Sequence, residues 1–196
     1  MNFSSVARSL EGKSRSVKSS GITWFILPSI FTVFFIILSV LFTLGIGFDA
    51  KPGTNIFKYI YDFLKNGEYK EGSNLPIVII VYLSLTAALL FIILFTGWII
   101  TIVVLANIVG LKEMLRKITT LPILSLDTQN KAKSALSNAG ASAVLLGLGI
   151  IIGPLAFIGI ILALVSASKS KQVANDILWQ LQVNQLAQTT NNPTHF

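Results

Sequence analysis

The acidic residues between the first two apolar runs have the types and spacing that could do chemistry. Asp62, Glu68 and Glu71 lie within a stretch of ten residues, and neighbouring carboxylates can act in hydrolysis or bind a cation. Their spacing is not that of an EF-hand loop, and lysines alternate with them along the same stretch. Such a pattern is more often a solvated set of ion pairs, so it does not predict a catalytic or metal site.

The other residue types on which enzyme chemistry depends are scarce. The chain has no cysteine, one histidine and two methionines, which excludes disulfides, zinc–thiolate sites and iron–sulfur clusters. His195 lies in a polar segment rather than in an apolar run, so we do not expect it to bind haem or copper within a membrane. Walker A, GxGxxG, HExxH and GxSxG motifs do not occur. The sequence therefore predicts a protein that is not an enzyme and uses no cofactor or metal.

The composition is typical of a membrane protein. Hydrophobic residues make up 53% of the 196 residues and charged residues 12%, about half the charge of a typical soluble domain. The charges gather in islands that separate three apolar runs, and a helix needs roughly 20 residues to cross a bilayer. Because backbone groups in lipid must be satisfied internally, we expect an all-α integral membrane protein with three transmembrane helices. Short amphipathic helices are expected in the first loop, after the second transmembrane helix and in the C-terminal tail.

The charge pattern divides the chain into seven segments. In order, they are a basic N-terminal segment (1–21), a first transmembrane helix (22–48), a first loop with a short amphipathic helix (49–74), a long second transmembrane helix (75–109) that continues as a stem to about residue 121, a second loop (122–140), a third transmembrane helix (141–167) and a polar tail (168–196) that is first helical and then disordered. The N-terminal segment fits a short surface helix or a flexible tail. The charged face of the first-loop helix mixes both signs, which favours a lid on the helix ends over a helix lying on lipid.

The second transmembrane helix is too long for a bilayer. Its uncharged run covers 75–111, and tilt absorbs only part of such a length, so the inner membrane boundary is expected near Asn107 or near Trp98. Beyond residue 109 one face is apolar and the opposite face charged, as in a half-exposed helix. The apolar face predicts a contact surface of this stem, made of Ile108, Leu111, Leu115 and Ile118. Aromatic and basic residues near the ends of the spans are predicted to anchor the membrane interface: Trp24, Tyr82, Trp98, Lys112, Arg116 and Lys117.

The third apolar run is rich in small residues that recur at intervals of three, four and seven. Such a stripe lets helix backbones approach closely in lipid. It predicts a helix-packing interface at Gly149, Gly153, Ala156, Ala163 and Ala167. The Gly153-Pro154 dipeptide predicts a kink within one continuous span. The alternative is a re-entrant hairpin that turns at this dipeptide, and it is disfavoured because each arm would be short for a bilayer.

Basic residues in short loops predict the orientation. The N-terminal segment, the stem and the second loop together carry nine Lys and Arg residues, whereas the first loop and the tail carry six. This predicts a multi-pass protein of a cell or viral membrane with its N-terminus in the cytoplasm and its C-terminus outside. Because the basic residues flank apolar runs, the net charge of +7 indicates membrane orientation and contact with anionic lipid rather than with nucleic acid.

These features favour a structural or accessory subunit whose helices pack within a larger membrane assembly. Its expected partners are the lipid bilayer and either other membrane subunits or further copies of itself. One alternative is an oligomeric pore, since Thr32, Ser39 and Thr43 share a helical face and uncharged hydroxyls can line a pore. Such hydroxyls more often hydrogen-bond to their own helix or to a neighbouring one. Another alternative is a carrier of lipid or of another apolar molecule.

Overall fold

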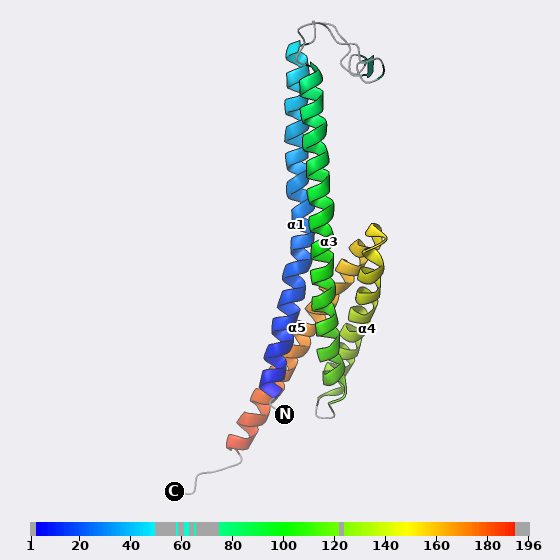
Figure 1. Cartoon of the computed structure of the whole chain (residues 1–196). Coiled ribbons are helices and arrows are strands. Elements are labelled where there is room, and N and C mark those ends of the chain that lie inside the picture. The colour runs from blue at the N-terminus through cyan, green and yellow to red at the C-terminus, as the bar shows by residue number, and fades with distance from the viewer. Residues whose placement is uncertain are drawn as a thin grey trace. The chain divides into compact units, whose positions relative to one another are not determined.

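A computed structural model describes residues 3–49, 58, 61–62, 65, 75–121 and 124–190 of the chain. These residues form four long helices and no strand, which confirms the all-α prediction (Figure 1). The helices are α1 (Phe3–Asp49), α3 (Leu75–Thr119), α4 (Leu126–Gly149) and α5 (Gly153–Thr190).

Three of these helices are long and apolar enough to cross a membrane. The qualifying stretches are Phe3–Leu44 in α1, Ile79–Thr119 in α3 and Gly153–Gln185 in α5. This finding confirms the prediction of a multi-pass membrane protein with three helices of membrane-spanning length.

The chain divides into two compact units, each built from parts of different helices. Unit 1 contains residues 1–25 and 98–196, which include the first part of α1, the last part of α3 and all of α4 and α5. Unit 2 contains residues 26–97, which include the remainder of α1 and α3.

Unit 1 has one apolar core to which all four helices contribute. Its fully buried side chains include Ala7, Leu10 and Val17 of α1, Val104, Ile108, Leu111, Leu115 and Ile118 of α3, Ala132, Ala135 and Ala139 of α4, and Ile160, Ala163, Ala167 and Val173 of α5. The N-terminal segment is thus neither a separate surface helix nor a flexible tail. Its apolar face is buried in this core, and the segment forms the first turns of α1.

The third transmembrane helix predicted over 141–167 is wrong as a single helix. The chain turns after Gly149 and starts α5 at Gly153, and α4 and α5 lie side by side as a hairpin (Figure 1). Pro154 explains the break, because its ring would clash with the carbonyl of Ile150 in a continuous helix. In the first turn of α5 the missing N–H of this proline costs nothing, and the Ile152 carbonyl accepts a hydrogen bond from the Leu155 amide at 2.9 Å.

The second loop is also shorter than the predicted 122–140, because α4 begins at Leu126. Ser125 caps this helix, and its hydroxyl accepts a hydrogen bond from the Thr128 amide at 3.3 Å. The capping oxygen satisfies one of the free amides in the first turn, as serine commonly does.

The predicted placement of the tail on the opposite side of the membrane from the second loop is wrong for unit 1. Gln180 in α5 donates a hydrogen bond to Ser125 at 2.9 Å, and Asp176 pairs with Lys131 of α4 at 2.9 Å. Groups in direct contact cannot lie on opposite sides of a bilayer. Because α5 runs back along α4, the tail and the α3–α4 loop lie at the same end of unit 1 (Figure 1).

Unit 2 is a pair of helical segments with an apolar surface. The rings of Phe42 in α1 and Tyr82 in α3 stack with centroids 4.0 Å apart, and the hydroxyls of Ser39 and Tyr82 lie within hydrogen-bond distance at 3.2 Å. Large apolar side chains on both helices are exposed, Phe91 and Leu94 among them. Such a surface suits a hydrocarbon environment.

The predicted helix of the first loop and the acidic cluster lie mostly outside the described residues. Lys58, Tyr61, Asp62 and Lys65 are described, and each is helical. The ammonium group of Lys65 lies 5.6 Å from the centre of the Tyr61 ring, a cation–π distance. Glu68 and Glu71 are outside the described part of the chain.

Candidate functional site

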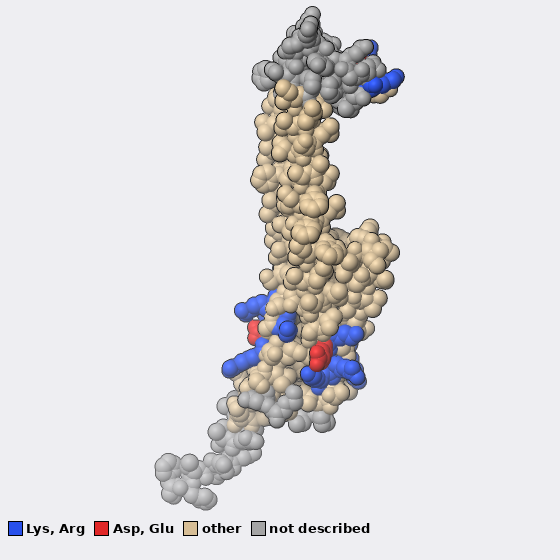
Figure 2. Space-filling model, in the orientation of Figure 1, with Lys and Arg blue, Asp and Glu red and all other residues tan. Residues whose placement is uncertain are grey.

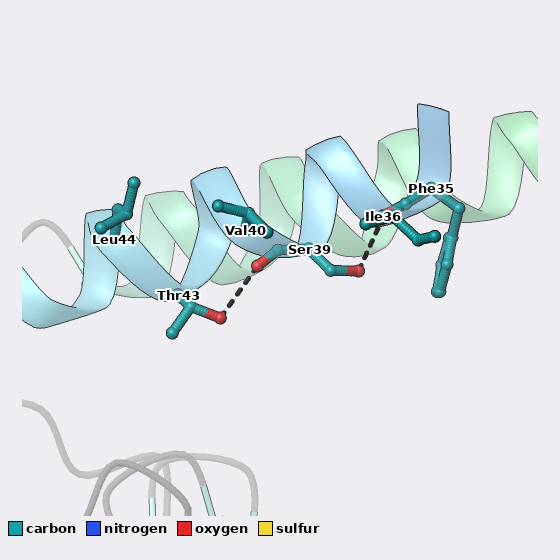
Figure 3. A pocket seen from close by; sticks show the side chains of 6 residues that line it. All are labelled: Phe35, Ile36, Ser39, Val40, Thr43 and Leu44. Atoms are coloured by element: carbon teal, nitrogen blue, oxygen red, sulfur yellow. Dashed lines mark hydrogen bonds between the residues drawn. The ribbon is translucent and has the colours of Figure 1, made fainter. Parts of the chain in front are cut away.

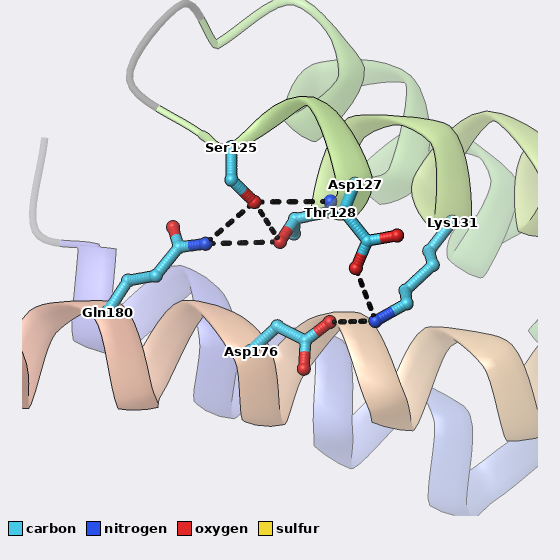
Figure 4. A network of polar contacts seen from close by, with 6 residues as sticks. All are labelled: Ser125, Asp127, Thr128, Lys131, Asp176 and Gln180. Atoms are coloured by element: carbon cyan, nitrogen blue, oxygen red, sulfur yellow. Dashed lines mark hydrogen bonds and ion pairs between the residues drawn. The ribbon is translucent and has the colours of Figure 1, made fainter.

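Six polar residues form a network that we name the α4–α5 clasp: Ser125, which caps α4, Asp127, Thr128 and Lys131 of α4, and Asp176 and Gln180 of α5 (Figure 4). The Lys131 ammonium lies 2.7 Å from Asp127 and 2.9 Å from Asp176. The Gln180 amide donates to the hydroxyls of Ser125 and Thr128 at 2.9 and 3.1 Å. The network joins the start of α4 to the second half of α5.

The electrostatics of the clasp centre on Lys131. Its hydrogen bonds to Asp127 and then to Asp176 raise the pKa of the Lys131 ammonium above the ordinary 10.5. A raised lysine pKa means that the charged form is favoured, so this amine does not act as a base at neutral pH. The chemistry of the clasp is therefore that of a structural ion pair between two helices.

Buried serines join the helices of unit 1 at three further places. The hydroxyl of Ser14 donates to the carbonyl of Ala167 at 2.6 Å, that of Ser142 to Gly159 at 2.7 Å, and that of Ser166 to Ala135 at 2.8 Å. Each bond runs from one helix to the backbone of another. Hydrogen bonds of this kind hold helices together where lipid removes the hydrophobic drive for association.

The small residues predicted as a packing interface lie mainly inside the chain's own hairpin. Gly149, Ala156, Ala163 and Ala167 are buried, whereas Gly153 is exposed at the turn. A Cβ on Gly149 would lie 2.5 Å from the Ala156 amide nitrogen, so only glycine permits this approach of α4 and α5. Gly149 of α4 therefore faces Ala156 of α5, although the sequence places both residues on one face of one helix.

The stem surface is likewise occupied by the chain itself. Ile108, Leu111, Leu115 and Ile118 are completely buried in the core of unit 1. The helical period of this stripe made its burial predictable. In this structure it contacts the other helices of unit 1 and is not available to a second protein.

The predicted interface anchors fall into three environments. Trp24 is partly buried, and its indole N–H donates to the Thr101 hydroxyl at 3.2 Å. Tyr82 lies in unit 2 in contact with Phe42. The other four, Trp98, Lys112, Arg116 and Lys117, are exposed on unit 1.

The hydroxyls considered for a pore bond to their own helix. Thr32 donates to the Pro28 carbonyl at 2.8 Å, Ser39 to Phe35 at 2.8 Å and Thr43 to Ser39 at 2.9 Å. Figure 3 shows Ser39 and Thr43 beside a shallow groove of about 350 Å³ that also includes Phe35, Ile36, Val40 and Leu44. These bonds to their own helix account for the hydroxyls without a pore, and bonding of this kind is the commoner use of Ser and Thr in membrane helices.

The sequence alone does not predict that these six residues form one network. The Asp127–Lys131 pair has the i, i+4 spacing of helical ion pairs, which is a readable signal, but its link to Asp176 spans 45 residues and depends on the hairpin. Among the residues that the structure describes, no three acidic or imidazole side chains gather as a metal site would require.

No protein-family model, curated protein or solved structure matches this chain.

Proposed function

We propose that the chain is a non-enzymatic membrane protein that acts as a structural or accessory subunit of a larger membrane assembly. The observation that supports this best is the use of buried polar groups in unit 1. The hydroxyls of Ser14, Ser142 and Ser166 each bond to the backbone of a neighbouring helix. Polar groups used in this way fix helices in place, which is the property that an architectural subunit needs.

The surface proposed for partners lies on unit 2. The stem and the small-residue face of unit 1 are filled by the chain's own helices. The two helices of unit 2 carry exposed large side chains such as Phe91, which stacks on Phe95 with ring centroids 5.9 Å apart, and Leu94. Other membrane subunits or further copies of the chain pack on part of this surface, and lipid covers the rest.

The geometry of unit 1 supports one orientation over the other. If the tail lies on the same side as the N-terminal segment, the end of α3 and the start of α4, that side carries eleven of the fifteen Lys and Arg residues and the first loop carries four. This bias exceeds the one expected from a tail on the far side and favours a cytoplasmic location for both ends of the chain. The hairpin then enters the bilayer from the cytoplasmic side.

The length of the hairpin supports a partial insertion. The uncharged arms, 134–149 and 153–168, have sixteen residues each, or about 24 Å of helix. The hydrocarbon core is about 30 Å thick. The side chain of Ile151 at the turn is 85% exposed, and insertion of the turn into lipid would shield it from water. In this proposal α1 and α3 cross the whole membrane. The α4–α5 hairpin is re-entrant, although α5 is by length and composition also able to span.

Native mass spectrometry after extraction in a mild detergent tests the proposed function. The expected result is a complex of fixed stoichiometry with other membrane chains or with further copies. Leu94→Ala on unit 2 should weaken this complex, whereas Leu148→Ala, an exposed position on α4 of unit 1, should leave it intact. A stable monomer with an enzymatic activity of its own would overturn the proposal.

A further inference from the structure

An open polar groove lies between α1 and α3 in unit 1. Its lining consists of Gly12, Arg15, Ser16, Ser19 and Ser20 of α1 and Asn107 of α3, and its volume is about 440 Å³. The Asn107 amide donates to the Ser20 hydroxyl at 3.4 Å. Within the described part of the chain, the hydroxyls of Ser16 and Ser19 make no hydrogen bond, so two donors remain open to a ligand.

The groove lies at the level where charged residues end on all four helices of unit 1. The charged residues that border the uncharged stretches are Lys18 in α1, Lys112 in α3, Lys133 in α4 and Lys169 in α5. Figure 2 shows the Lys and Arg side chains of unit 1 as a band away from the α4–α5 turn.

Contacts between the helices place these charge boundaries close to one plane. Lys169 donates to Ser134 at 2.7 Å, next to Lys133 in the chain, and Ser14, one turn before Lys18, bonds to Ala167 at 2.6 Å. A membrane surface is the simplest reason for four helices to lose their charges at one level. The groove residues of α1 and α3 therefore lie on both sides of this plane.

We propose that this groove binds the phosphate group of an anionic phospholipid. Arg15 presents a guanidinium group, which matches phosphate oxygens in a forked geometry, and the free hydroxyls of Ser16 and Ser19 add neutral donors. The Lys13 ammonium lies next to the groove, 3.4 Å from the position of a Cβ on Gly110. Glu11 lies 3.7 Å from Arg15, an exposed and therefore weak pair that a phosphate can replace.

The position of the groove favours a lipid over a soluble phosphate. Lipid phosphates are concentrated at the membrane surface, and their negative potential attracts the neighbouring basic residues. Acyl chains attached to a phosphate in the groove would extend along the uncharged surface beyond Ser20. A soluble phosphate ester would gain only the polar contacts.

Native mass spectrometry of the purified full chain in detergent, titrated with short-chain phosphatidylglycerol, tests the proposal. One phosphatidylglycerol molecule should remain bound, and phosphatidylcholine at the same concentration should bind at least about tenfold more weakly. Arg15→Gln and the double variant Ser16→Ala/Ser19→Ala should each lower the affinity for phosphatidylglycerol about tenfold, since a hydrogen bond to a charged group is worth a decade or more in affinity. Glu11→Gln should raise the affinity because it releases Arg15.

Two controls separate this site from general electrostatics. Arg8→Gln removes the same charge from α1 outside the groove, and Ser137→Ala removes an exposed hydroxyl from α4; both should bind phosphatidylglycerol as the unmodified chain does. An equal loss in Arg8→Gln and Arg15→Gln would show nonspecific attraction and overturn the proposal. Displacement of the lipid by inorganic phosphate at equal concentration would assign the groove to a soluble anion and also overturn it. Thermal unfolding of each variant verifies that it is folded.

Discussion

Replacing Gly149 by alanine directly perturbs the turn of the α4–α5 hairpin. The added Cβ would lie 2.5 Å from the amide nitrogen and 2.6 Å from the Cα of Ala156, and both are backbone atoms that cannot move without moving α5. Overpacking of this kind typically costs about 1–3 kcal/mol. The higher intrinsic helix propensity of alanine would stabilise α4 by about 1 kcal/mol at most. We therefore expect Gly149→Ala to lower the free energy of unfolding by about 1–2 kcal/mol.

Gly147→Ala is the matched control, because a Cβ at Gly147 in the same helix has no neighbour within 4 Å. This variant should be neutral or more stable by up to about 1 kcal/mol. Reversible unfolding of the full chain by a denaturing detergent, in mixed micelles, measures both. In a continuous helix over 141–167, residues 149 and 156 would be about 10 Å apart along the axis and both variants would gain stability. Equal stabilisation by the two substitutions would thus refute the hairpin.

Three other perturbations test the packing of unit 1. Leu111→Ala should lower the free energy of unfolding by about 2–5 kcal/mol, because this side chain is fully buried and its removal leaves a cavity; an effect below about 1 kcal/mol in the same unfolding assay would contradict its burial. Ser166→Ala removes the bond to Ala135 and should cost about 0.5–1.5 kcal/mol, whereas no loss would mean that this bond is not formed. Lys131 contributes stability at pH values below its unfolded pKa, and the contribution is lost as the pH rises through the raised pKa of the folded state, above 10.5. The stability difference between the unmodified chain and Lys131→Met should therefore disappear at strongly alkaline pH, and a difference that grows with pH would contradict the clasp.

The helix content and the burial of the stem were predictable because each depends on a local pattern. Long uncharged runs in lipid must be helical, and the stripe from Ile108 to Ile118 has the period of a helix with one buried face. The buried half of the N-terminal segment has the same period in Leu10 and Val17. An apolar stripe does not state whether lipid or protein will cover it, so the assignment of this segment to the core required the structure.

The hairpin was not predictable from composition. A Gly- and Ile-rich run has the same composition whether it forms one transmembrane helix or two helices joined by a turn. Gly149 and Ala156 are seven residues apart, which places them on one face of a continuous helix. In the hairpin the same two residues meet from opposite helices. The local signal was Gly153-Pro154, which fits both a kink and a helix start. The tight contact across the turn decides between them, and that contact is not local in sequence.

The sidedness of α5 tests the central claim most directly. The chain contains no cysteine, so single-cysteine variants at exposed positions report one site each: Asn130→Cys at the start of α4, Gln182→Cys near the end of α5 and Lys58→Cys in the first loop. Labelling of sealed vesicles with a membrane-impermeant thiol reagent should modify residues 130 and 182 from the same side and residue 58 from the other. Labelling of residues 130 and 182 from opposite sides would contradict the hairpin and restore a third transmembrane span.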